Sequence, residues 1–388
     1  MTTVEIVDDL AAAEALAPAW DDLAVACSLP LCAPGWMLSW WMHVRPPKTA
    51  LRILTVRDGP ELVALAPWFL HTDEDKRSDM RFLGAELSDR VDILCRGGRE
   101  REVLPALRQA LGTLTPQPDL IAFEAVPLDS PWPRLLTSGL RGHLRFSRFR
   151  NSAYPAPVVM LTADTPEAWL AGRSSNFRGQ MGRLRRRLER EGGCVRHISE
   201  PAEIQSAVTA LLTLHAERWD GRGASKLLEP GVEELLRKAA VALGPERLRL
   251  WAVELDGKLI SVQLFLAAGG EIKYWNGGWS EEHADLKPSM LTILAALQDG
   301  IVRGERRLDL GAGTHAYKLR FANDQDPLSW GGLVVRNRRW PRTKIELMPL
   351  VMRYRAKRLA LAMPAPLTRR AEAFVASRRA GAQGSTPQ

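Results

Sequence analysis

Residues 52–70 read RILTVRDGPELVALAPWFL, and residues 249–266 read RLWAVELDGKLISVQLFL. Each stretch places an Asp-Gly pair, Asp58-Gly59 or Asp256-Gly257, between two runs of mainly apolar residues. This pattern is typical of a β-hairpin, because Asp-Gly readily adopts the positive φ angles of a tight turn. The sequence therefore predicts the same hairpin twice, once in each half of the chain.

The segments that follow each hairpin also occur in the same order. In the second half we expect a strand (271–279), a helix (288–302), a short strand (306–313), a helical turn (315–322) and a last strand (331–337). In the first half we expect a strand near 80–95, a helix at 101–114 and a strand at 119–126. Helix, three strands, helix and strand then form one mixed unit that occurs twice. The expected fold class is α+β, with mainly antiparallel sheets.

The chain has 388 residues, which suits two domains. We expect an N-terminal domain at 1–160, a second domain at 161–335 that includes a basic connecting helix at 174–192, and an extension at 336–388. The extension holds 13 basic and 2 acidic residues, whereas residues 1–335 hold 40 basic and 43 acidic residues. The net charge of +8 therefore comes from the extension.

Several classes of protein are disfavoured by composition. The N-terminus lacks the basic start of a secretory signal, and no run of about 18 uncharged apolar residues could span a membrane. The four cysteines form no CxxC pair and no Cys/His ligand spacing. We expect a cytoplasmic protein with reduced thiols and no metal site.

The ordered series resembles the GNAT fold, and its duplication resembles the FemAB-like and CelD-type (cellulose-biosynthesis acetyltransferase-like) group. The resembling segments are SSNFRGQMGRLRRRLEREG (174–192), LHAERW (214–219), the second hairpin, KPSMLT (287–292) and RLDLGAGTHAYKLRFA (307–322). The resemblance implies two tandem GNAT-like domains, with the acyl donor in a cleft between the fourth and fifth strands of the second. The first half resembles the group more loosely, which implies a non-catalytic domain.

The donor site departs from the usual GNAT pattern. Ordinary GNAT enzymes hold the CoA pyrophosphate with a glycine-rich loop at a helix start, and here the corresponding stretch is DLKPSMLT (285–292). The amides at the start of this helix still attract anions. Lys287, Ser289 and Met290 are therefore the candidate donor-binding residues, with Asn276 on the preceding strand. Since FemAB-like relatives use aminoacyl-tRNA, acyl-CoA and aminoacyl-tRNA both remain candidate donors.

Acyl transfer to an amine needs a base, and His215 is the first candidate. It shares one helix face with Leu211 and Trp219, so we expect His215 and Trp219 to point inward. A hydrogen-bonded core histidine is the alternative. Trp219 is a candidate substrate-binding residue, and Arg218 is expected to be solvated or paired.

Four further residues complete the candidate site. Asp309 lies at the end of the expected fifth strand, where a carboxylate could orient or deprotonate an amine. Tyr317 and Lys318 match a Tyr-Lys pair of the CelD-type group, and a GNAT tyrosine of this region often protonates the leaving thiolate. Tyr274 is a candidate to line the substrate slot. Packing in the core, or for Lys318 a surface position, is the alternative for each residue.

Two basic segments suggest further partners. The run Arg183–Arg190 is either the solvated face of an amphipathic helix or an anion site for donor phosphates or tRNA. The extension 336–388 suits contact with an anionic membrane surface slightly better than docking on the body. Peripheral attachment at the inner membrane face is therefore expected, and the oligomeric state is left open.

The sequence thus predicts an acyltransferase that moves an acyl group from acyl-CoA to a small-molecule acceptor. The acceptor would be an amine or hydroxyl of a sugar, amino acid or cell-envelope or polysaccharide precursor. The alternatives are an aminoacyl-tRNA-dependent transferase of the FemAB type and a non-catalytic binding protein with the same fold.

Overall fold

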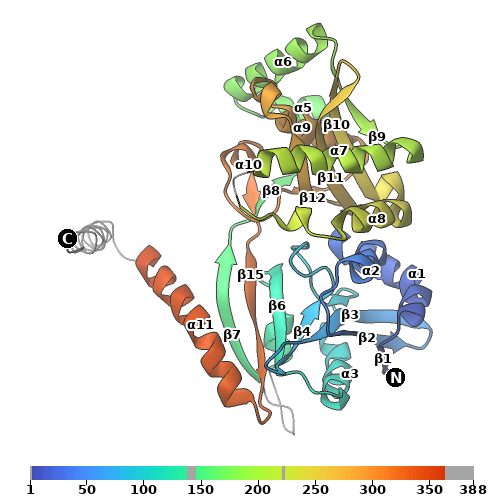
Figure 1. The fold of residues 1–388 in the computed structure, drawn as a ribbon, viewed down its shortest axis with the longest axis vertical. Coiled ribbons are helices and arrows are strands. Elements are labelled where there is room, and N and C mark those ends of the chain that lie inside the picture. The colour runs from blue at the N-terminus through green and yellow to red at the C-terminus, as the bar shows by residue number, and fades with distance from the viewer. Residues whose placement is uncertain (1, 138–145, 221–222, 363–388) are drawn as a thin grey trace, which may run out of the picture.

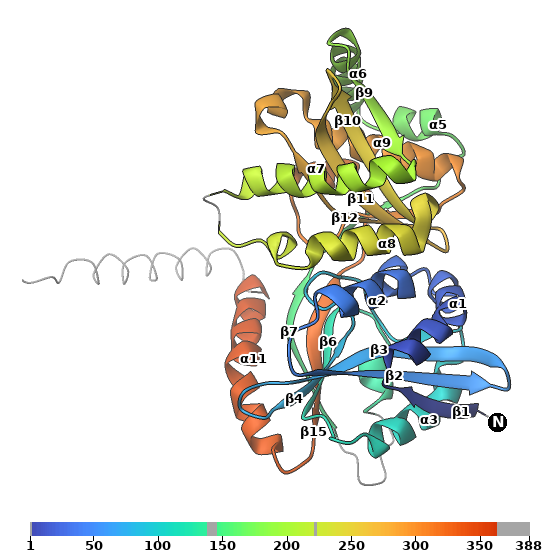
Figure 2. The same ribbon diagram turned by 45° about the vertical axis from the view of Figure 1, so that its right-hand side comes forward.

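The computed structural model describes residues 2–137, 146–220 and 223–362, which form two units stacked along the long axis (Figures 1 and 2). The first unit comprises the described residues of 2–154 and 328–362, and the second unit comprises those of 156–326. Each unit is built on one mixed sheet with helices packed against it.

The first sheet has the strand order β1-β2-β3-β4-β6-β15-β7, with β5 paired to β3. Its strands are β1 (Thr2–Val7), β2 (Thr49–Asp58), β3 (Glu61–Thr72), β4 (Ser78–Phe82), β5 (Leu94–Cys95), β6 (Leu120–Pro127), β7 (Phe146–Tyr154) and β15 (Leu328–Val335). The helices of this unit are α1 (Leu10–Ala26), η1 (Pro30–Cys32), α2 (Pro34–His43), α3 (Glu100–Thr113), α4 (Trp132–Leu135) and α11 (Trp340–Ala362).

The second sheet has the order β14-β8-β13-β12-β11-β10-β9. Its strands are β8 (Pro157–Met160), β9 (Cys194–Ile198), β10 (Leu248–Leu255), β11 (Lys258–Ala268), β12 (Glu271–Trp279), β13 (Arg307–Asp309) and β14 (Asp324–Gln325). The helices are α5 (Pro166–Ala171), α6 (Ser175–Arg190), α7 (Pro201–Trp219), η2 (Lys226–Leu228), α8 (Val232–Arg247), η3 (Glu281–Leu286), α9 (Pro288–Val302) and α10 (Ala316–Phe321).

The repeated order of elements is confirmed. Both expected hairpins form, β2 with β3 and β10 with β11. The second turn has positive φ at both Asp256 and Gly257, as the Asp-Gly pair predicts. In each unit the strand after the hairpin is followed by a helix and then by a strand that pairs with it in parallel. These parallel pairs are β4 with β6 and β12 with β13.

The two units exchange strands, which the sequence did not predict. The last expected strand of the second half, β15, lies in the first sheet between β6 and β7 and is antiparallel to both. Its Leu333 and Val335 are buried in the core of the first unit. Conversely, β8 pairs with β13 and β14 of the second sheet. The domain boundaries expected at residues 160 and 335 therefore do not separate the two sheets. β8 lies within residues 1–160 but belongs to the second sheet, and β15 lies within residues 161–335 but belongs to the first sheet.

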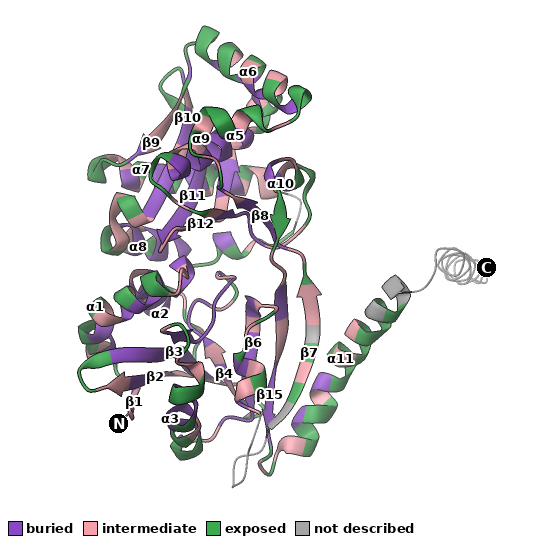
Figure 3. Cartoon of the chain, turned by 180° about the vertical axis from the view of Figure 1, so that it is seen from behind, coloured by how far each residue is buried: buried purple, intermediate pink, exposed green. Residues whose placement is uncertain are grey.

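Apolar packing joins the two units. Helices α7 and α8 cover one face of the second sheet, and α8 packs on α2 of the first unit. One cluster of buried residues therefore runs from Trp36 of α2 to Leu235 of α8. The other face of the second sheet has its own core under α6 and α9. In Figure 3, buried residues follow the strands of both sheets and exposed residues follow the outer helix faces.

Both basic helices pack apolar residues against a sheet or core. Ser174 caps α6 by accepting a hydrogen bond from the Phe177 amide at 3.2 Å, and Leu184 and Leu188 are buried. The expected basic helix at 174–192 is thus confirmed, with its arginines mainly exposed. Helix α11 docks on the first sheet, because Leu347 packs with Leu120 and Val334. Residues 363–388 of the expected extension lie outside the described residues.

A buried charge network also crosses between the units. Asp309 of β13 is completely buried and pairs with Arg90 of the first unit and, at 3.1 Å, with Lys273 Nζ of β12. Lys273 Nζ also contacts Asp89 Oδ1 at 2.6 Å, and Arg90 reaches Asp326 Oδ2 at 2.7 Å. Since an unpaired charge is costly in the interior, these contacts fix one unit against the other.

Replacing Arg90 with Met should lower the free energy of unfolding by about 3–5 kcal/mol, because Asp309 would lose a buried partner. Urea unfolding measures this change. The control is Arg185→Met, which removes an exposed pair with Glu189 and should have little effect. Equal, small effects of the two substitutions would show that the network does not hold the units together.

Candidate functional site

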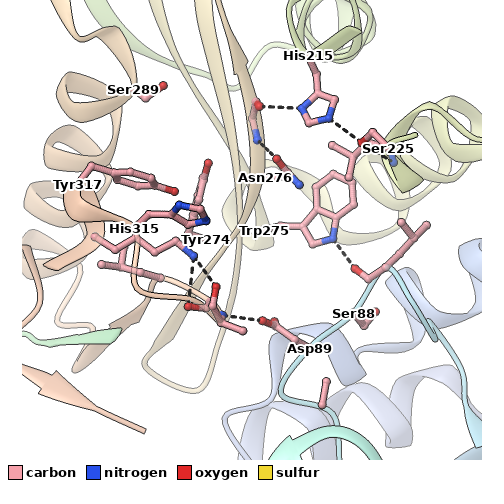
Figure 4. Close-up of a pocket in the computed structure, with 18 of the residues that line it drawn as sticks. Ser88, Asp89, His215, Ser225, Tyr274, Trp275, Asn276, Ser289, His315 and Tyr317 are labelled. Carbon is pink, nitrogen blue, oxygen red and sulfur yellow. Dashed lines mark hydrogen bonds between the residues drawn. The ribbon is translucent and has the colours of Figure 1, made fainter. Parts of the chain in front are cut away.

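A cavity of about 1000 Å³ lies between the two units. The first unit contributes residues of the stretch 81–91, residues 124–125 and Trp330. The second unit contributes the end of α7, the middle of β12, the start of α9 and residues of the stretch 310–320. Figure 4 shows the labelled side chains converging on this space from both units.

The cavity extends into a slot at the point where two parallel strands separate. β12 and β13 are paired only from Glu271 to Lys273, after which β12 continues to Trp279 while β13 ends. A β-bulge at Trp275 increases the separation locally, since Phe265 pairs with Tyr274 and Leu264 with Asn276. Tyr274 lines one side of the slot and Gly311 the other. This is the cleft expected between the fourth and fifth strands.

Gly278 lets α7 pack directly onto β12. A Cβ at Gly278 would lie 2.4 Å from the Leu211 carbonyl oxygen and 2.7 Å from the His215 backbone nitrogen. Only glycine permits this approach. As a result, the His215 ring reaches the Gly277 carbonyl on the wall of the cavity.

His215 points inward, as its helix face predicted. Its Nδ1 lies 3.2 Å from the Gly277 carbonyl oxygen and its Nε2 lies 2.8 Å from Ser225 Oγ. A carbonyl only accepts, so Nδ1 carries a proton and Nε2 accepts from the Ser225 hydroxyl in neutral His215. The ring stacks on Trp219, which also lines the cavity. Burial lowers the pKa of His215, so the neutral form that can act as a base is favoured.

Two tyrosines face each other at the slot. The Tyr274 hydroxyl donates to Gln263 Oε1 at 2.8 Å, and Tyr317 also lines the cavity. Burial raises the pKa of both phenols, so both are neutral acids near pH 7. Gln263 Nε2 in turn donates to Ser289 Oγ at 3.1 Å. Tyr317 thus has the protonation state that an acid for a leaving thiolate needs.

Lys318 follows Tyr317 on α10 and is held by the loop after β13. Its Nζ donates to the carbonyl oxygens of Ala312 at 2.9 Å and Gly311 at 3.3 Å. Burial, followed by the nearby charge of Lys273, lowers the pKa of Lys318 to about 8. The side chain lines the cavity, which contradicts the surface alternative.

Asp309 lies behind the cavity wall and does not line it. Its Oδ1 accepts from the Gly311 amide at 2.7 Å, while Oδ2 pairs with Arg90 and Lys273. Burial alone would raise the pKa of this carboxyl, but the charges of Lys273 and Arg90 hold it below its usual range. Because both oxygens of Asp309 already have partners, this carboxylate positions the surrounding groups. The geometry does not favour direct proton abstraction by Asp309.

The candidate donor residues all line the cavity, namely Asn276, Lys287, Ser289 and Met290. Lys287 adopts a left-handed conformation (φ 48°) that turns the chain into α9 at Pro288. Its side chain is exposed at the cavity rim. Asn276 Oδ1 accepts from the Gly277 amide at 2.8 Å, which leaves the Nδ2 donors of Asn276 for a ligand.

The first-unit wall was missed by sequence reasoning. Arg81 pairs with Glu124 at 2.8 Å and with Glu86 at 3.4 Å. Asp89 joins this wall, and its Oδ2 accepts from the Ala312 amide at 3.3 Å. The polar run ELSDR (86–90), within the strand expected near 80–95, was the available signal.

Arg218 is half-buried and forms no ion pair with a carboxylate in the described part of the chain. It lies over the Trp279 ring at 5.2 Å and lines the cavity. Sequence reasoning also passed over Ser225, which lies in a loop without helical or strand periodicity. Among the described residues, no cluster of three or more His, Cys, Asp or Glu side chains suited to a metal ion is found.

Comparison with known proteins agrees with the fold. Residues 175–319 match the family model described as an acetyltransferase (GNAT) domain. A crystal structure of FemX is 12% identical with a TM-score of 0.60, covering 86% of this chain and 98% of that chain. A search of curated proteins gave no match.

A second solved structure has the same fold. It is the C-terminal domain (DUF2156) of a putative lysylphosphatidylglycerol synthetase from Agrobacterium fabrum, 11% identical with a TM-score of 0.53, covering 87% of this chain and 95% of that chain. The fold expected from the FemAB-like resemblance is therefore supported, whereas the CelD-type resemblance stays a prediction. The chain is thus an α+β acyltransferase with two GNAT-like units, and its residues 175–319 are similar to an acetyltransferase (GNAT) domain.

Proposed function

We propose that this protein transfers an acyl group from acyl-CoA to an amine of a small molecule bound between the two units. The separation of charge across the cavity is the observation that carries this proposal. Basic side chains gather on the second-unit wall, whereas three carboxylates, Glu86, Asp89 and Glu124, lie on the first-unit wall.

The second-unit wall suits an anionic donor. Arg218, Lys287 and Arg320 line it, and none of them forms an ion pair with a carboxylate of the described residues. Lys287 lies at the start of α9, where the helix dipole adds to its charge. These groups can hold the phosphates of CoA without the usual glycine-rich loop, while the slot beside Tyr274 receives the acyl end.

The first-unit wall suits an amine acceptor. Its carboxylates attract a protonated amine, although Arg81, Lys226 and Lys273 offset part of their charge. Trp275 and Trp330 offer aromatic faces in the same cavity. Such a mixture suits an amino sugar, an amino acid or a related cell-envelope precursor.

The acyl transfer would use His215, which contacts β12, together with Tyr317 and Lys318 of α10. The bound ammonium first releases one proton to water, and His215 takes the second proton that the neutral amine loses as its nitrogen attacks the thioester carbon. The carbon–sulfur bond breaks, and the Tyr317 hydroxyl protonates the leaving thiolate. Two N–H groups of Lys318 are used by the loop carbonyls, and the third can donate to the developing oxyanion.

Aminoacyl transfer from tRNA is the second candidate. Exposed arginines of α6 favour it, because they form a basic helix on the surface of the acyltransferase domain. However, Arg185 and Arg187 pair with Glu189 and Glu191 on the same helix, which reduces its charge. Acyl-CoA therefore remains the preferred donor.

We also propose that the outer face of α11 contacts an anionic membrane surface at the inner membrane face. Ile345, Met348 and Met352 are exposed there beside Arg353 and Arg355. No helix in the described ranges is long and apolar enough to cross a bilayer. Binding to phosphatidylglycerol vesicles, but not to phosphatidylcholine vesicles, that weakens with salt would support this contact.

Acetyl-CoA should raise the melting temperature of the protein in a concentration-dependent way, since a ligand that binds only the folded state stabilises it by mass action. Lys287→Ala should weaken this effect, because it removes a cation from the donor wall. Longer acyl-CoAs and charged tRNA are titrated in parallel. Stabilisation by charged tRNA alone would select aminoacyl transfer instead.

His215→Ala should lower kcat by about 100-fold or more while the fold is retained, because a general base is lost. Transfer to small amines and far-ultraviolet circular dichroism are measured together. The matched control is His197→Ala, since His197 is also partly buried but lies on β9, outside the cavity lining. Unchanged turnover, or loss of the fold, would show that His215 is a core residue.

A further inference from the structure

The Ser225 hydroxyl is hydrogen-bonded to the Nε2 nitrogen of His215 at the cavity wall. The His215 side chain is only 3% exposed, and both ring nitrogens already have partners. Ser225 is partly exposed and lines the cavity, with its hydroxyl 2.8 Å from His215 Nε2 (Figure 4). Since the Ser225 hydroxyl is the hydrogen-bond partner of Nε2, a substrate proton can reach Nε2 through it.

The direction of this hydrogen bond is fixed by the second nitrogen. Gly277 is held in β12 and presents a carbonyl to Nδ1, so Nδ1 is the protonated nitrogen of the neutral ring. Nε2 then accepts the Ser225 proton, and the Ser225 oxygen keeps a lone pair toward the cavity. A proton relay toward His215 requires this hydrogen-bond direction, with Ser225 as the donor and His215 Nε2 as the acceptor.

The loop that carries Ser225 is fixed at the acceptor side of the cavity. Ser225 accepts from the Leu227 amide at 3.4 Å, and the Leu227 side chain is buried. The neighbouring Lys226 Nζ lies 2.7 Å from Glu86 Oε2 of the first-unit wall. Since Glu86 is one of the carboxylates proposed to attract the amine, the acceptor would lie next to Ser225.

We propose that Ser225 is a catalytic residue that relays the proton of the acceptor amine to His215. This inference rests on the proposed acyl transfer. As the amine nitrogen bonds to the thioester carbon, its proton moves to Ser225 Oγ while the Ser225 proton moves to His215 Nε2. Ser225 ends as a neutral hydroxyl and His215 as an imidazolium, so no bond to Ser225 is formed and no other reactant is needed.

The hydrogen bond is tested without substrate. Nitrogen-15 spectra of the imidazole rings should show His215 as the Nδ1–H tautomer in the wild type. Ser225→Ala should change the Nε2 shift and leave the Nδ1–H signal in place. An Nε2–H tautomer in the wild type would overturn the relay, because Nε2 could not then accept a proton.

The relay itself is tested by three substitutions at one position. Ser225→Thr keeps the hydroxyl and should retain most of kcat. Ser225→Ala should lower kcat at least about tenfold, since proton transfer is interrupted. Ser225→Asn is the sharper control, because its side chain can still cap Leu227 and donate to His215 but has no hydroxyl to relay a proton. It should be as impaired as Ser225→Ala.

Turnover is followed as thiol released from acetyl-CoA with a panel of amino sugars and amino acids, and the dissociation constant for acetyl-CoA is measured on each variant. Unchanged donor affinity with reduced kcat in the Ala and Asn variants supports the relay. If the wild type is active and the Ala or Asn variant is equally active, the relay is overturned but the proposed acyl transfer is not. An acyl ester on Ser225, detected by peptide mass spectrometry, also overturns it, since Ser225 would then be the nucleophile. A wild type that neither binds acetyl-CoA nor transfers its acyl group overturns the proposed function and the relay together.

Discussion

A negative charge buried at the junction of the two units constrains the rest of this structure. Asp309 has no access to water, so its charge must be balanced by cations, and these come from both units as Arg90 and Lys273. The same carboxylate holds the Gly311 amide, and the loop that begins there holds Lys318. One buried charge therefore connects the packing of the units to the geometry of the site.

The first unit consequently takes part in the site and is more than a scaffold. It supplies Asp89 and Arg90 to the charge network and a carboxylate-lined wall to the cavity. The strand exchange strengthens this arrangement, since β15 returns to the first sheet after the chain has formed the second-unit side of the cavity. Donor and acceptor can then approach the reacting position from opposite units, which the opposite charges of the two walls favour.

Local patterns predicted much of this arrangement. The Asp-Gly turns gave the hairpins, and the period of α7 placed His215 and Trp219 inward, where both line the cavity. Features that depend on distant segments could not be predicted. Nothing in the alternation of β15 identifies the first sheet as its partner, and Asp309 looked like an accessible carboxylate because its partner Arg90 is remote in sequence. Ser225 was missed because only the folded chain brings its loop to His215.

The account rests on one site shared by the two units, with the donor on one side and the acceptor on the other. A crystal structure with a non-hydrolysable thioether analogue of acetyl-CoA tests this claim most directly. The account predicts that the analogue lies in the slot between β12 and the chain after β13, with its phosphates near Lys287 and its acyl end facing Ser225 and the first-unit wall. An analogue bound outside this cavity, or with its acyl end directed away from the first unit, would contradict it.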